Sequence, residues 1–425
     1  MAEVLIQNGR VVDPSQNLDG QADIYIKDGV IQAVEPEISV SCGNIIDATG
    51  LVVLPGLVDM HVHLRDPGLT YKEDIFTGCD AAAAGGVTSV ACMPNTNPVT
   101  DSPETLTYIR TKAATAHAKV YPVASITAGM KGETLNDFTA LKQAGAIAVS
   151  DDGRPVENGR RMMEGMQKAY HAGLPVISHC EDLSIIRGGI INEGEISKKL
   201  GVPGMHRASE DSVTAREIAL AHATGTRIHI AHVSTEGSAA LVRDAKARGV
   251  QVTCETCPHY FMLTEEELLR RDADYRMNPP LRTEADRKAM LAAVLDGTVD
   301  CIVTDHAPHA LEEKADFLKA PNGVVGLETS LAASLTSLYH TGLVSLSRLV
   351  ELMSTNPARI LGLNAGTLRP GAPGDVAIVD LNLTWTVEPE KLHSKSHNTV
   401  FKGKTFTGKA VATLLDGKLV YHYQG

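Results

Sequence analysis

The sequence predicts an α/β protein, a (β/α)₈ barrel of the TIM type with a small β-sandwich-like domain formed by the N- and C-terminal segments. Three observations lead to this prediction. Between residue 51 and about residue 365, eight short β-rich runs alternate with longer segments that have apolar residues at helical spacing. Several of these segments end at a glycine just before the next run. Both flanks alternate apolar and polar residues in the manner of β-strands.

The eight runs are short, apolar and each followed by a helical pattern. They are 51–64, 87–93, 119–126, 146–150, 175–179, 227–232, 251–257 and 301–304. The helical patterns between them include 212–223 and 236–247, and Gly145, Gly173 and Gly249 stand where helices are expected to end. Eight βα units in succession predict a closed barrel of parallel strands.

The two flanks are expected to pack together, because neither offers enough strands for a stable sheet alone. Turn dipeptides interrupt them at Asn8-Gly9, Asp28-Gly29 and Asp416-Gly417. We therefore predict a composite β domain from residues 1–50 plus 367–425 and a barrel from residues 51–366.

Composition disfavours several classes of partner. The 425 residues carry a formal net charge of −12 without a basic run, which disfavours nucleic acid. The N-terminus lacks a signal-peptide pattern and no apolar stretch reaches about 18 residues, so we expect no membrane association. The seven cysteines are odd in number and lie mostly in apolar runs, which predicts reduced thiols and a cytoplasmic location. Cys254 and Cys257 match C-x-x-C without a second pair, and we interpret them as buried strand residues.

The first run ends in His61 and His63, followed by Arg65. Residues two apart on a strand point to the same side, so the two imidazoles could share a metal ion. A single His-x-His also fits an ordinary core strand. Arg65 faces the same space and could hold a carboxylate, because a planar guanidinium binds carboxylates well.

Other runs also end in polar residues, and in such barrels chemistry gathers at the C-terminal ends of the strands. These residues are Asn95, Asp151, Asp152, His179, His232, Asp305 and His309. Four histidines and two carboxylates exceed one tetrahedral site and predict two metal ions, with zinc favoured over magnesium. Long polar loops at 186–207 and 310–326 are expected on the same face. We interpret nine other histidines as core or surface residues: His117, His171, His206, His222, His229, His340, His393, His397 and His422.

Four segments carry a family resemblance: 61–68 (HVHLRDPG), 93–96 (MPNT), 255–260 (ETCPHY) and 304–309 (TDHAPH). They resemble the bacterial type I dihydroorotases of the amidohydrolase superfamily, and the similarity extends over essentially the whole chain. The resemblance implies two Zn²⁺ per chain, one held by His61, His63 and Asp305 and the other by His179 and His232. Many relatives bridge the two metals with a carboxylated lysine, but the fourth strand here ends without one. Asp152 takes that place by its distance to His179, with Asp151 as the alternative.

The resemblance also implies the substrate contacts. The side chains of Arg65, Asn95 and His309 would bind the α-carboxylate or the ring. The side chain of Asn278 would contact the pyrimidine ring. Backbone groups of Asn322 and Gly323 would bind the ring amide. The family usually has an aromatic residue where Asn322 stands. Because the implied contact is mainly through the backbone, this departure concerns the packing of the loop more than the function.

The implied activity is that of a dihydroorotase, which interconverts N-carbamoyl-L-aspartate and L-dihydroorotate reversibly in de novo pyrimidine (UMP) biosynthesis. Asp305 would be the catalytic residue, taking a proton from the attacking hydroxide and passing it to the departing ring nitrogen. Allantoinase and dihydropyrimidinase are alternatives, and Arg65 favours a carboxylate-bearing substrate over theirs. A non-catalytic scaffold for aspartate transcarbamoylase is disfavoured, because all six ligand candidates are present. A homodimer and a complex with aspartate transcarbamoylase stay open as partners.

Overall fold

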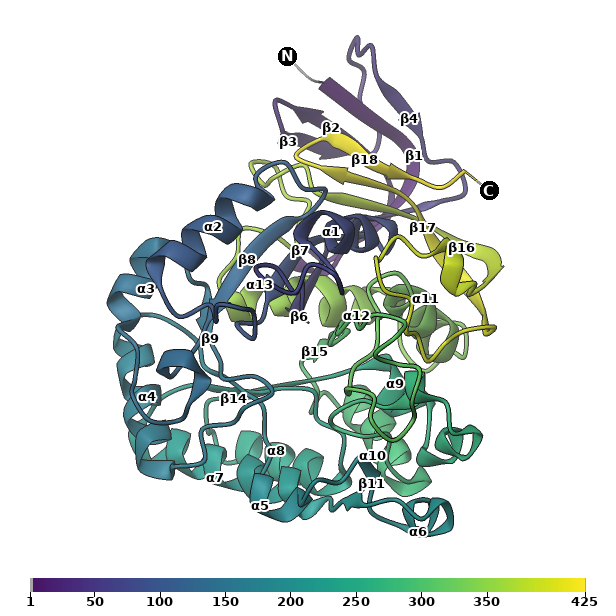
Figure 1. Ribbon diagram of the computed structural model, residues 1–425. Coiled ribbons are helices and arrows are strands. Elements are labelled where there is room, and N and C mark those ends of the chain that lie inside the picture. Colours follow the sequence, from purple (N-terminus) through teal and green to yellow (C-terminus); the bar gives the residue numbers. More distant parts are fainter. Residues whose placement is uncertain (1–2, 425) are drawn as a thin grey trace.

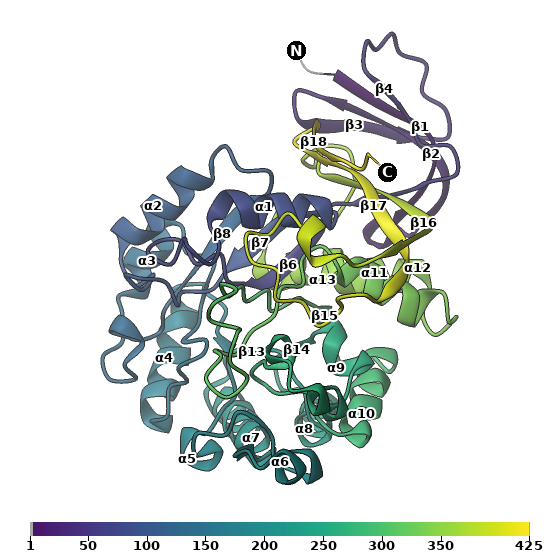
Figure 2. The ribbon, with the colours of Figure 1, turned by 45° about the vertical axis from the view of Figure 1, so that its right-hand side comes forward.

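The computed structural model describes residues 3–424 and contains a curled parallel sheet and a separate mixed sheet made from both ends of the chain (Figure 1). The mixed sheet stands above the barrel in Figure 2, with the early and late strands side by side. The predicted α/β fold class, a TIM barrel with a β domain from the termini, is confirmed.

Eight parallel strands form the barrel, one in each of the eight predicted runs. They are β6 (Leu57–Val62), β7 (Val87–Cys92), β8 (Lys119–Ala124), β9 (Ala148–Val149), β10 (Ile177–Ser178), β13 (Ile228–Ile230), β14 (Val252–Thr256) and β15 (Cys301–Ile302). They pair in two sets of four, in the orders β6-β7-β8-β9 and β10-β13-β14-β15. Parallel bridges from Val149 to Val176 and from Val62 to His306 join the two sets and close the barrel.

The longer helices lie around the outside of the barrel strands (Figures 1 and 2). The longer ones are α1 (Ile75–Ala84), α2 (Pro103–Ala113), α3 (Phe138–Ala144), α4 (Gly159–His171), α7 (Ala208–Thr224), α8 (Glu236–Ala247) and α10 (Glu284–Leu295). Several begin at a side chain that accepts a hydrogen bond from a free N–H of the first turn: Asp74, Ser102, Asp137, Asn158, Thr235 and Thr283. Gly145, Gly173 and Gly249 follow α3, α4 and α8 with positive φ, as predicted.

Shorter elements complete the barrel region. After β15 come α11 (Ser330–Ser334), α12 (Leu346–Val350) and α13 (Asn356–Leu361), with π-helical turns at Leu335–Tyr339 and Glu351–Thr355. The loop predicted at 186–207 contains regular structure: α5 (Leu183–Ile186) leads into it, and β11 (Ile191–Asn192), α6 (Glu195–Leu200) and β12 (Gly204–Met205) lie within it. The short helix α9 (Pro258–Met262) follows β14. 3₁₀ turns lie at Pro14–Gln16, Ala128–Met130, Glu265–Arg270, Ala273–Tyr275 and Pro389–Lys391.

The mixed sheet has the strand order β18-β17-β16-β5-β1-β2-β3, with β4 added beside β1. Its strands are β1 (Glu3–Asp13), β2 (Leu18–Lys27), β3 (Val30–Glu35), β4 (Ile45–Asp47), β5 (Val52–Pro55), β16 (Val376–Thr386), β17 (Thr405–Leu415) and β18 (Lys418–His422). The turns at Asp28-Gly29 and Asp416-Gly417 have positive φ at both residues, as tight hairpins require. The turn predicted at Asn8-Gly9 is wrong. Those residues form a bulge inside β1, where a Cβ on Gly9 would lie 2.6 Å from Val53 Cγ2.

The run 51–64 divides between the two sheets. β5 pairs with β1 and β16 in the mixed sheet, whereas β6 belongs to the barrel. Gly56 separates them, and a Cβ there would lie 2.1 Å from Thr88 Oγ1, so the chain can pass only without a side chain. The mixed sheet thus extends into the range that the sequence assigns to the barrel.

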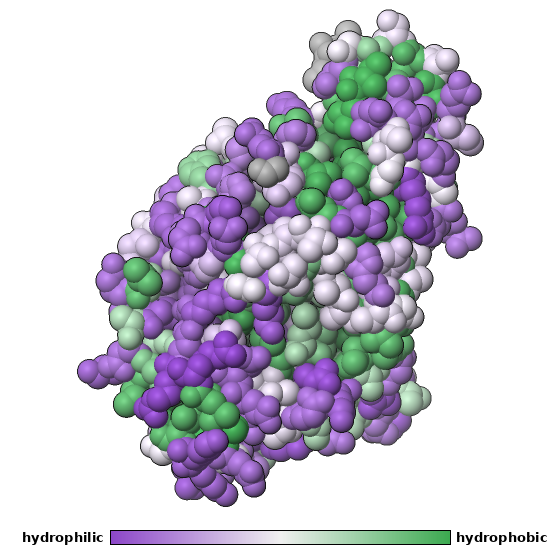
Figure 3. Space-filling view, turned by 90° about the vertical axis from the view of Figure 1, so that its right-hand side faces the viewer, coloured by the Kyte–Doolittle hydropathy of each residue, from purple (hydrophilic) through white to green (hydrophobic). Residues whose placement is uncertain are grey.

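Each assembly encloses its own apolar cluster. Met60, Val90 and Ile230 belong to the barrel core, while Ile24 and Val53 belong to a second cluster inside the mixed sheet. Apolar colour gathers on the mixed sheet at the top of Figure 3 and continues toward the barrel beneath it. Throughout residues 3–424, every helix is too short or too polar to span a lipid bilayer.

Candidate active site

The six predicted metal ligands gather at the C-terminal ends of the barrel strands. They are His61 in β6, His63 just after it, Asp152 after β9, His179 after β10, His232 after β13 and Asp305 after β15. All six are buried. Strands far apart in the chain supply them, so closure of the barrel is what brings them together.

The ligand atoms form two groups that share Asp152. His61, His63 and Asp152 make one group, and Asp152, His179 and His232 make the other, with the ligand atoms of each group within 4.8 Å of one another. Asp152 Oδ1 lies 3.3 Å from His61 Nε2 and 3.4 Å from His179 Nδ1, and its Oδ2 lies 3.4 Å from His63 Nε2. One carboxylate that faces imidazoles on both sides has the position of a bridging ligand.

Asp305 flanks the first group. Its Oδ1 lies 3.0 Å from His63 Nε2 and 3.6 Å from His61 Nε2. The carboxylate can therefore contact a metal held by these two histidines while it also reaches the space in front of them.

Three histidines have the outer ring nitrogen next to a side-chain oxygen that accepts its hydrogen bond. The pairs are His61 Nδ1 with Glu255 Oε1 (2.5 Å), His63 Nδ1 with Asn95 Oδ1 (2.7 Å) and His179 Nε2 with Glu181 Oε2 (3.3 Å). An oxygen acceptor requires the proton on that nitrogen, which leaves the inner nitrogen with a free lone pair. This is the usual arrangement behind histidines that bind metals.

Asp151 points elsewhere. Its Oδ1 accepts hydrogen bonds from the amides of Ile126 (2.7 Å) and Thr127 (3.2 Å), and its Oδ2 accepts one from the Thr127 hydroxyl. Burial raises the pKa of Asp151 to about 6. The neighbouring carboxylates therefore face opposite sides, and Asp152 is the one in the cluster.

The electrostatics of the cluster favour a bound cation. Burial opposes charge on Asp152, but the surrounding imidazoles, His61 first among them, hold its pKa well below the ordinary value. Burial likewise opposes charge on His61, yet Glu255 and Asp152 raise its pKa well above the ordinary value. His61 Nε2 and Asp152 Oδ1 face each other without a hydrogen-bond partner among residues 3–424. A buried nitrogen and a buried oxygen with free lone pairs fit the ligands of a metal ion. Imidazole together with carboxylate suits a transition metal.

Three residues of the site have left-handed backbone conformations. φ is +60° at Arg65, +32° at His232 and +48° at Asp305. A residue with a Cβ is strained there, and such strain concentrates at functional sites. The strained backbone turns these side chains toward the cluster at the point where their strands end.

Arg65 is a buried guanidinium with hydrogen-bonding capacity to spare. It is 8% exposed, and its Nε donates to Pro308 O (3.2 Å). His309 Nε2 lies 3.5 Å from Arg65 Nη2, but this nitrogen donates to Asn322 O (2.9 Å) and Nδ1 accepts from Lys72 Nζ (3.2 Å), so the ring offers Arg65 no lone pair. The remaining N–H groups of Arg65 are therefore available to an anionic ligand.

Other predicted substrate groups are engaged within the protein. Asn95 holds His63, as described above, and Asn278 Nδ2 donates to Glu181 Oε1 (2.9 Å). The Gly323 amide donates to Arg276 O (2.9 Å), so a substrate contact there would replace an existing bond. The Asn322 side chain accepts a hydrogen bond from Arg276 Nη2 (3.3 Å), which ties this loop to the segment before Asn278.

The C-terminal segment braces this loop. Asn398 Oδ1 accepts from the His309 amide (3.1 Å), and Asn398 Nδ2 donates to Gly323 O (2.9 Å). Lys314, also buried, donates from Nζ to Gly323 O (3.0 Å) and Pro321 O (3.0 Å). The loop after β15 is thus held from both sides.

The sequence reasoning missed the residues that support the ligands. Glu255 lies between His61 and His229, whose Nε2 is 3.1 Å from Glu255 Oε2. Asp59 accepts a hydrogen bond from the His61 amide (3.1 Å) and another from Thr304 Oγ1 (2.6 Å), which ties β6 to β15. An acidic residue inside an otherwise apolar strand was the available signal, because buried charge needs a partner.

Comparison with known proteins places the chain among cyclic amide hydrolases. A family model described as "Dihydro-orotase-like" matches residues 50–238. Proteins named dihydroorotase from Geobacter metallireducens and Citrifermentans bemidjiense are 51% and 53% identical over 421 residues, which cover 98% of this chain and 99% of theirs. Among solved structures, L-hydantoinase (dihydropyrimidinase) from Arthrobacter aurescens is similar with a TM-score of 0.90 and 27% identity, covering 100% of this chain and 97% of that one.

Proposed function

We propose that this chain, which belongs to the dihydroorotase family, interconverts N-carbamoyl-L-aspartate and L-dihydroorotate at a site that holds two zinc ions. Family membership rests on relatives about half identical over nearly their full length. The chain is a cyclic amide hydrolase. Its own residues indicate which cyclic amide is the substrate.

The observation that carries the proposal is the unsatisfied guanidinium of Arg65. It is buried at the rim of the His/Asp cluster, and Pro308 O is its single carbonyl acceptor within residues 3–424. A buried cation with free N–H donors selects an anionic ligand, and a carboxylate matches the guanidinium geometry. Dihydroorotate has a carboxylate on its ring, whereas dihydrouracil and hydantoin have none.

The ligand groups support two metal ions, with His61, His63 and Asp305 toward one and His179 and His232 toward the other. Asp152 faces both groups and supports the bridging role. Zinc ions bound there would lower the pKa of water and polarise the amide carbonyl.

Asp305 is the proposed proton carrier. In ring opening, an oxygen from water bonds to the ring carbonyl carbon, and the bond from that carbon to the ring nitrogen breaks. Asp305 accepts the proton from the attacking water and returns it to the departing nitrogen, and closure reverses both transfers. Its Oδ1 lies 3.0 Å from His63 Nε2, so it stands beside the reacting groups.

We place this reaction in pyrimidine biosynthesis in the cytoplasm. All seven cysteines are free thiols, which fits a reducing compartment. A homodimer and a complex with aspartate transcarbamoylase stay predictions from the sequence.

The test compares substrates with and without a carboxylate. Zinc-loaded protein is assayed on dihydroorotate, dihydrouracil, hydantoin and allantoin, with loss of each followed optically. We expect dihydroorotate to be turned over in preference. The variant Arg65→Gln should lose about a hundredfold in kcat/KM on dihydroorotate, the scale of a lost charge-assisted hydrogen bond, with little change on dihydrouracil.

Two results would contradict the proposal. One is faster turnover of dihydrouracil, hydantoin or allantoin than of dihydroorotate by the unmodified enzyme. The other is an equal loss on all substrates in Arg65→Gln, which would make Arg65 a structural residue.

A further inference from the structure

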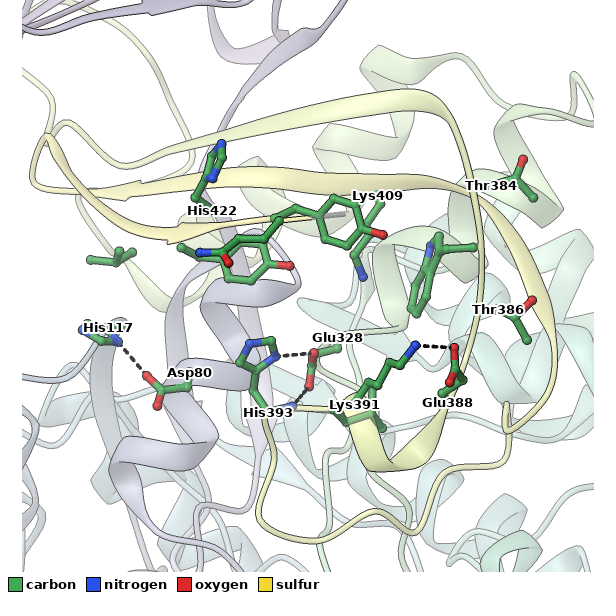
Figure 4. A pocket seen from close by; sticks show the side chains of 16 residues that line it. Asp80, His117, Glu328, Thr384, Thr386, Glu388, Lys391, His393, Lys409 and His422 are labelled. Carbon is green, nitrogen blue, oxygen red and sulfur yellow. Dashed lines mark hydrogen bonds and ion pairs between the residues drawn. The ribbon is translucent and has the colours of Figure 1, made fainter.

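A second cavity lies at the junction of the barrel and the mixed sheet, apart from the catalytic cluster (Figure 4). Its volume is about 740 Å³, which is within the range of small-molecule sites. β16, β17 and β18 line it together with the segment 388–393, and Asp80 and Glu328 from the barrel region close it. We call it the junction cavity. None of its lining residues belongs to the cluster described above.

The acidic side chains of the junction cavity each have a partner. The pairs are Asp80 with His117 (2.6 Å), Glu328 with His393 (2.9 Å) and Glu388 with Lys391 (2.8 Å), and all three are drawn in Figure 4. Each carboxylate thus has a basic partner closer than Lys409, while the charge of Glu328 also acts on Lys409 and opposes the lowering of its pKa by burial.

Lys409 is the unmatched cation. Its residue is 8% exposed, and its ammonium points into the cavity in Figure 4. Nζ lies 3.6 Å from the centroid of the Trp385 ring and 5.3 Å from that of Tyr423. Within residues 3–424 it has no hydrogen bond and no ion pair, and burial lowers its pKa. A buried ammonium without an anionic partner is costly, even with aromatic rings beside it.

We propose that the junction cavity binds a small organic monoanion, a carboxylate attached to a flat ring, with the carboxylate on Lys409 Nζ. One unmatched positive charge calls for one negative charge. A dianion such as a phosphate monoester would bring a second negative charge into a cavity whose other lysine, Lys391, is already paired with Glu388. The walls also include Tyr421, Tyr423 and Leu392, which suit a flat apolar body better than a bare ion.

The chain offers its own reporter for this site. Trp385 is the single tryptophan of the 425 residues, and it lies against Lys409. A ligand that reaches Lys409 Nζ changes the electrostatic surroundings of this ring. The fluorescence of Trp385 therefore reports ligand binding in the junction cavity rather than at the site near Arg65.

The experiment titrates the full-length, metal-loaded protein with benzoate and follows Trp385 emission. Three further probes each differ from benzoate in one way that the proposal makes important. Acetate has the carboxylate without the ring, benzamide has the ring without the charge, and inorganic phosphate is an anion with neither a carboxylate nor a ring. We expect a saturable change with benzoate at millimolar concentration and clearly weaker binding of the other three. Lys409→Met should weaken benzoate binding by about tenfold or more, as expected for loss of a charged hydrogen-bond donor.

The matched control is Lys391→Met, which removes an exposed lysine of the same cavity that is already paired with Glu388. It should bind benzoate as the unmodified protein does. Lys409→Arg keeps the charge and should retain binding, which provides a test even if Lys409→Met folds poorly.

The proposal is overturned if benzoate produces no saturable change, or if benzamide or phosphate binds as well as benzoate. Equal benzoate affinity in Lys409→Met and the unmodified protein would also overturn it, as would loss of binding in both Lys409→Met and Lys409→Arg with retained fold. None of these outcomes depends on the catalytic reaction, so the test is separate from that of the proposed function.

Discussion

The catalytic cluster and the junction cavity both place histidines beside carboxylates, but they arrange them differently. In the cluster, His61, His63 and His179 each turn an inner nitrogen toward one shared carboxylate, that of Asp152. In the junction cavity, His117 and His393 each meet a different carboxylate in a separate pair. Convergence of several lone pairs on one point, and not the number of histidines, is what makes a metal site.

Burial separates the two regions further. The His61 side chain is 0% exposed, while the side chains of His117 and His393 are 51% and 44% exposed. Water can satisfy the exposed rings, so a pair is enough for them. The buried rings need fixed partners on both sides, and a metal ion on the inner side meets that need.

The largest expected effect comes from removing the carboxylate of Asp152, which both ligand groups share. Asp152→Ala should lose about one metal ion per chain and about a thousandfold or more in activity, because both ligand groups depend on its carboxylate. Elemental analysis and steady-state kinetics measure the two losses. Asp151→Ala is the matched control and should keep both metals, because Asp151 bonds only to residues 126–127 within the described chain. The reverse pattern would move the bridge to Asp151.

Asp305→Asn tests the proton transfer with little change of shape. We expect activity to fall by about 10²- to 10⁴-fold, the usual contribution of a general acid–base group. The metal content should stay close to that of the unmodified protein, because His61 and His63 still hold their side of the site. Recovery of activity with excess zinc would show that Asp305 is a ligand without a role in proton transfer.

Glu255→Gln should weaken metal binding by about 10- to 100-fold, as is usual when the partner behind a ligating histidine is altered. Glu255 accepts from His61 Nδ1 at 2.5 Å, and the amide can no longer stabilise the ring in the same way. Competition with a chelator gives the affinity. His229→Gln, on the other side of Glu255, is the control and should have a smaller effect. Equal losses in the two variants would mean that the core packing matters more than the orientation of His61.

The smallest effect concerns stability at the junction cavity. Burial lowers the pKa of Lys409, so between that pKa and the unfolded value of about 10.4 the unfolded chain binds more protons. The penalty on folding is complete below the folded pKa and disappears as pH rises to the unfolded value. Relative to Lys409→Met, the unmodified protein should therefore gain stability with rising pH.

Thermal unfolding of both proteins from pH 7 to pH 10.5 measures this difference. At pH 7 we expect the two free energies of unfolding to differ by no more than about 1 kcal/mol, because loss of the cation–π contact offsets removal of the buried charge. If the unmodified protein instead lost stability relative to Lys409→Met as the pH rises, the lowered pKa of Lys409 would be contradicted.

The fold and most of the site could be predicted from local patterns. His61, His179, His232 and Asp305 each stand at the end of an apolar run, and the barrel rule collects such residues at one face. The bulge at Asn8-Gly9 was missed, because the same dipeptide serves tight turns and bulges. What separates the two is the close approach of Val53, 44 residues further along the chain, and that approach is a tertiary contact.

The partners of the site residues lay beyond such reasoning. Glu255 reaches His61 across 194 positions of the chain, and no periodicity links them. Which of Asp151 and Asp152 turns inward depends on the hydrogen bonds that residues 126–127 offer to Asp151. The contact between Lys409 and Trp385 became visible only in the folded mixed sheet.

The amino-acid order alone was sufficient for the alternation of strands and helices, the polar strand ends and the choice of ligand types, because these follow from spacing along a few residues. The shared carboxylate at Asp152, the acceptors behind the histidines and the unmatched ammonium of Lys409 required the folded chain. The physical reason is that hydrogen bonding and burial depend on which distant groups meet when the barrel closes and the two chain ends pair.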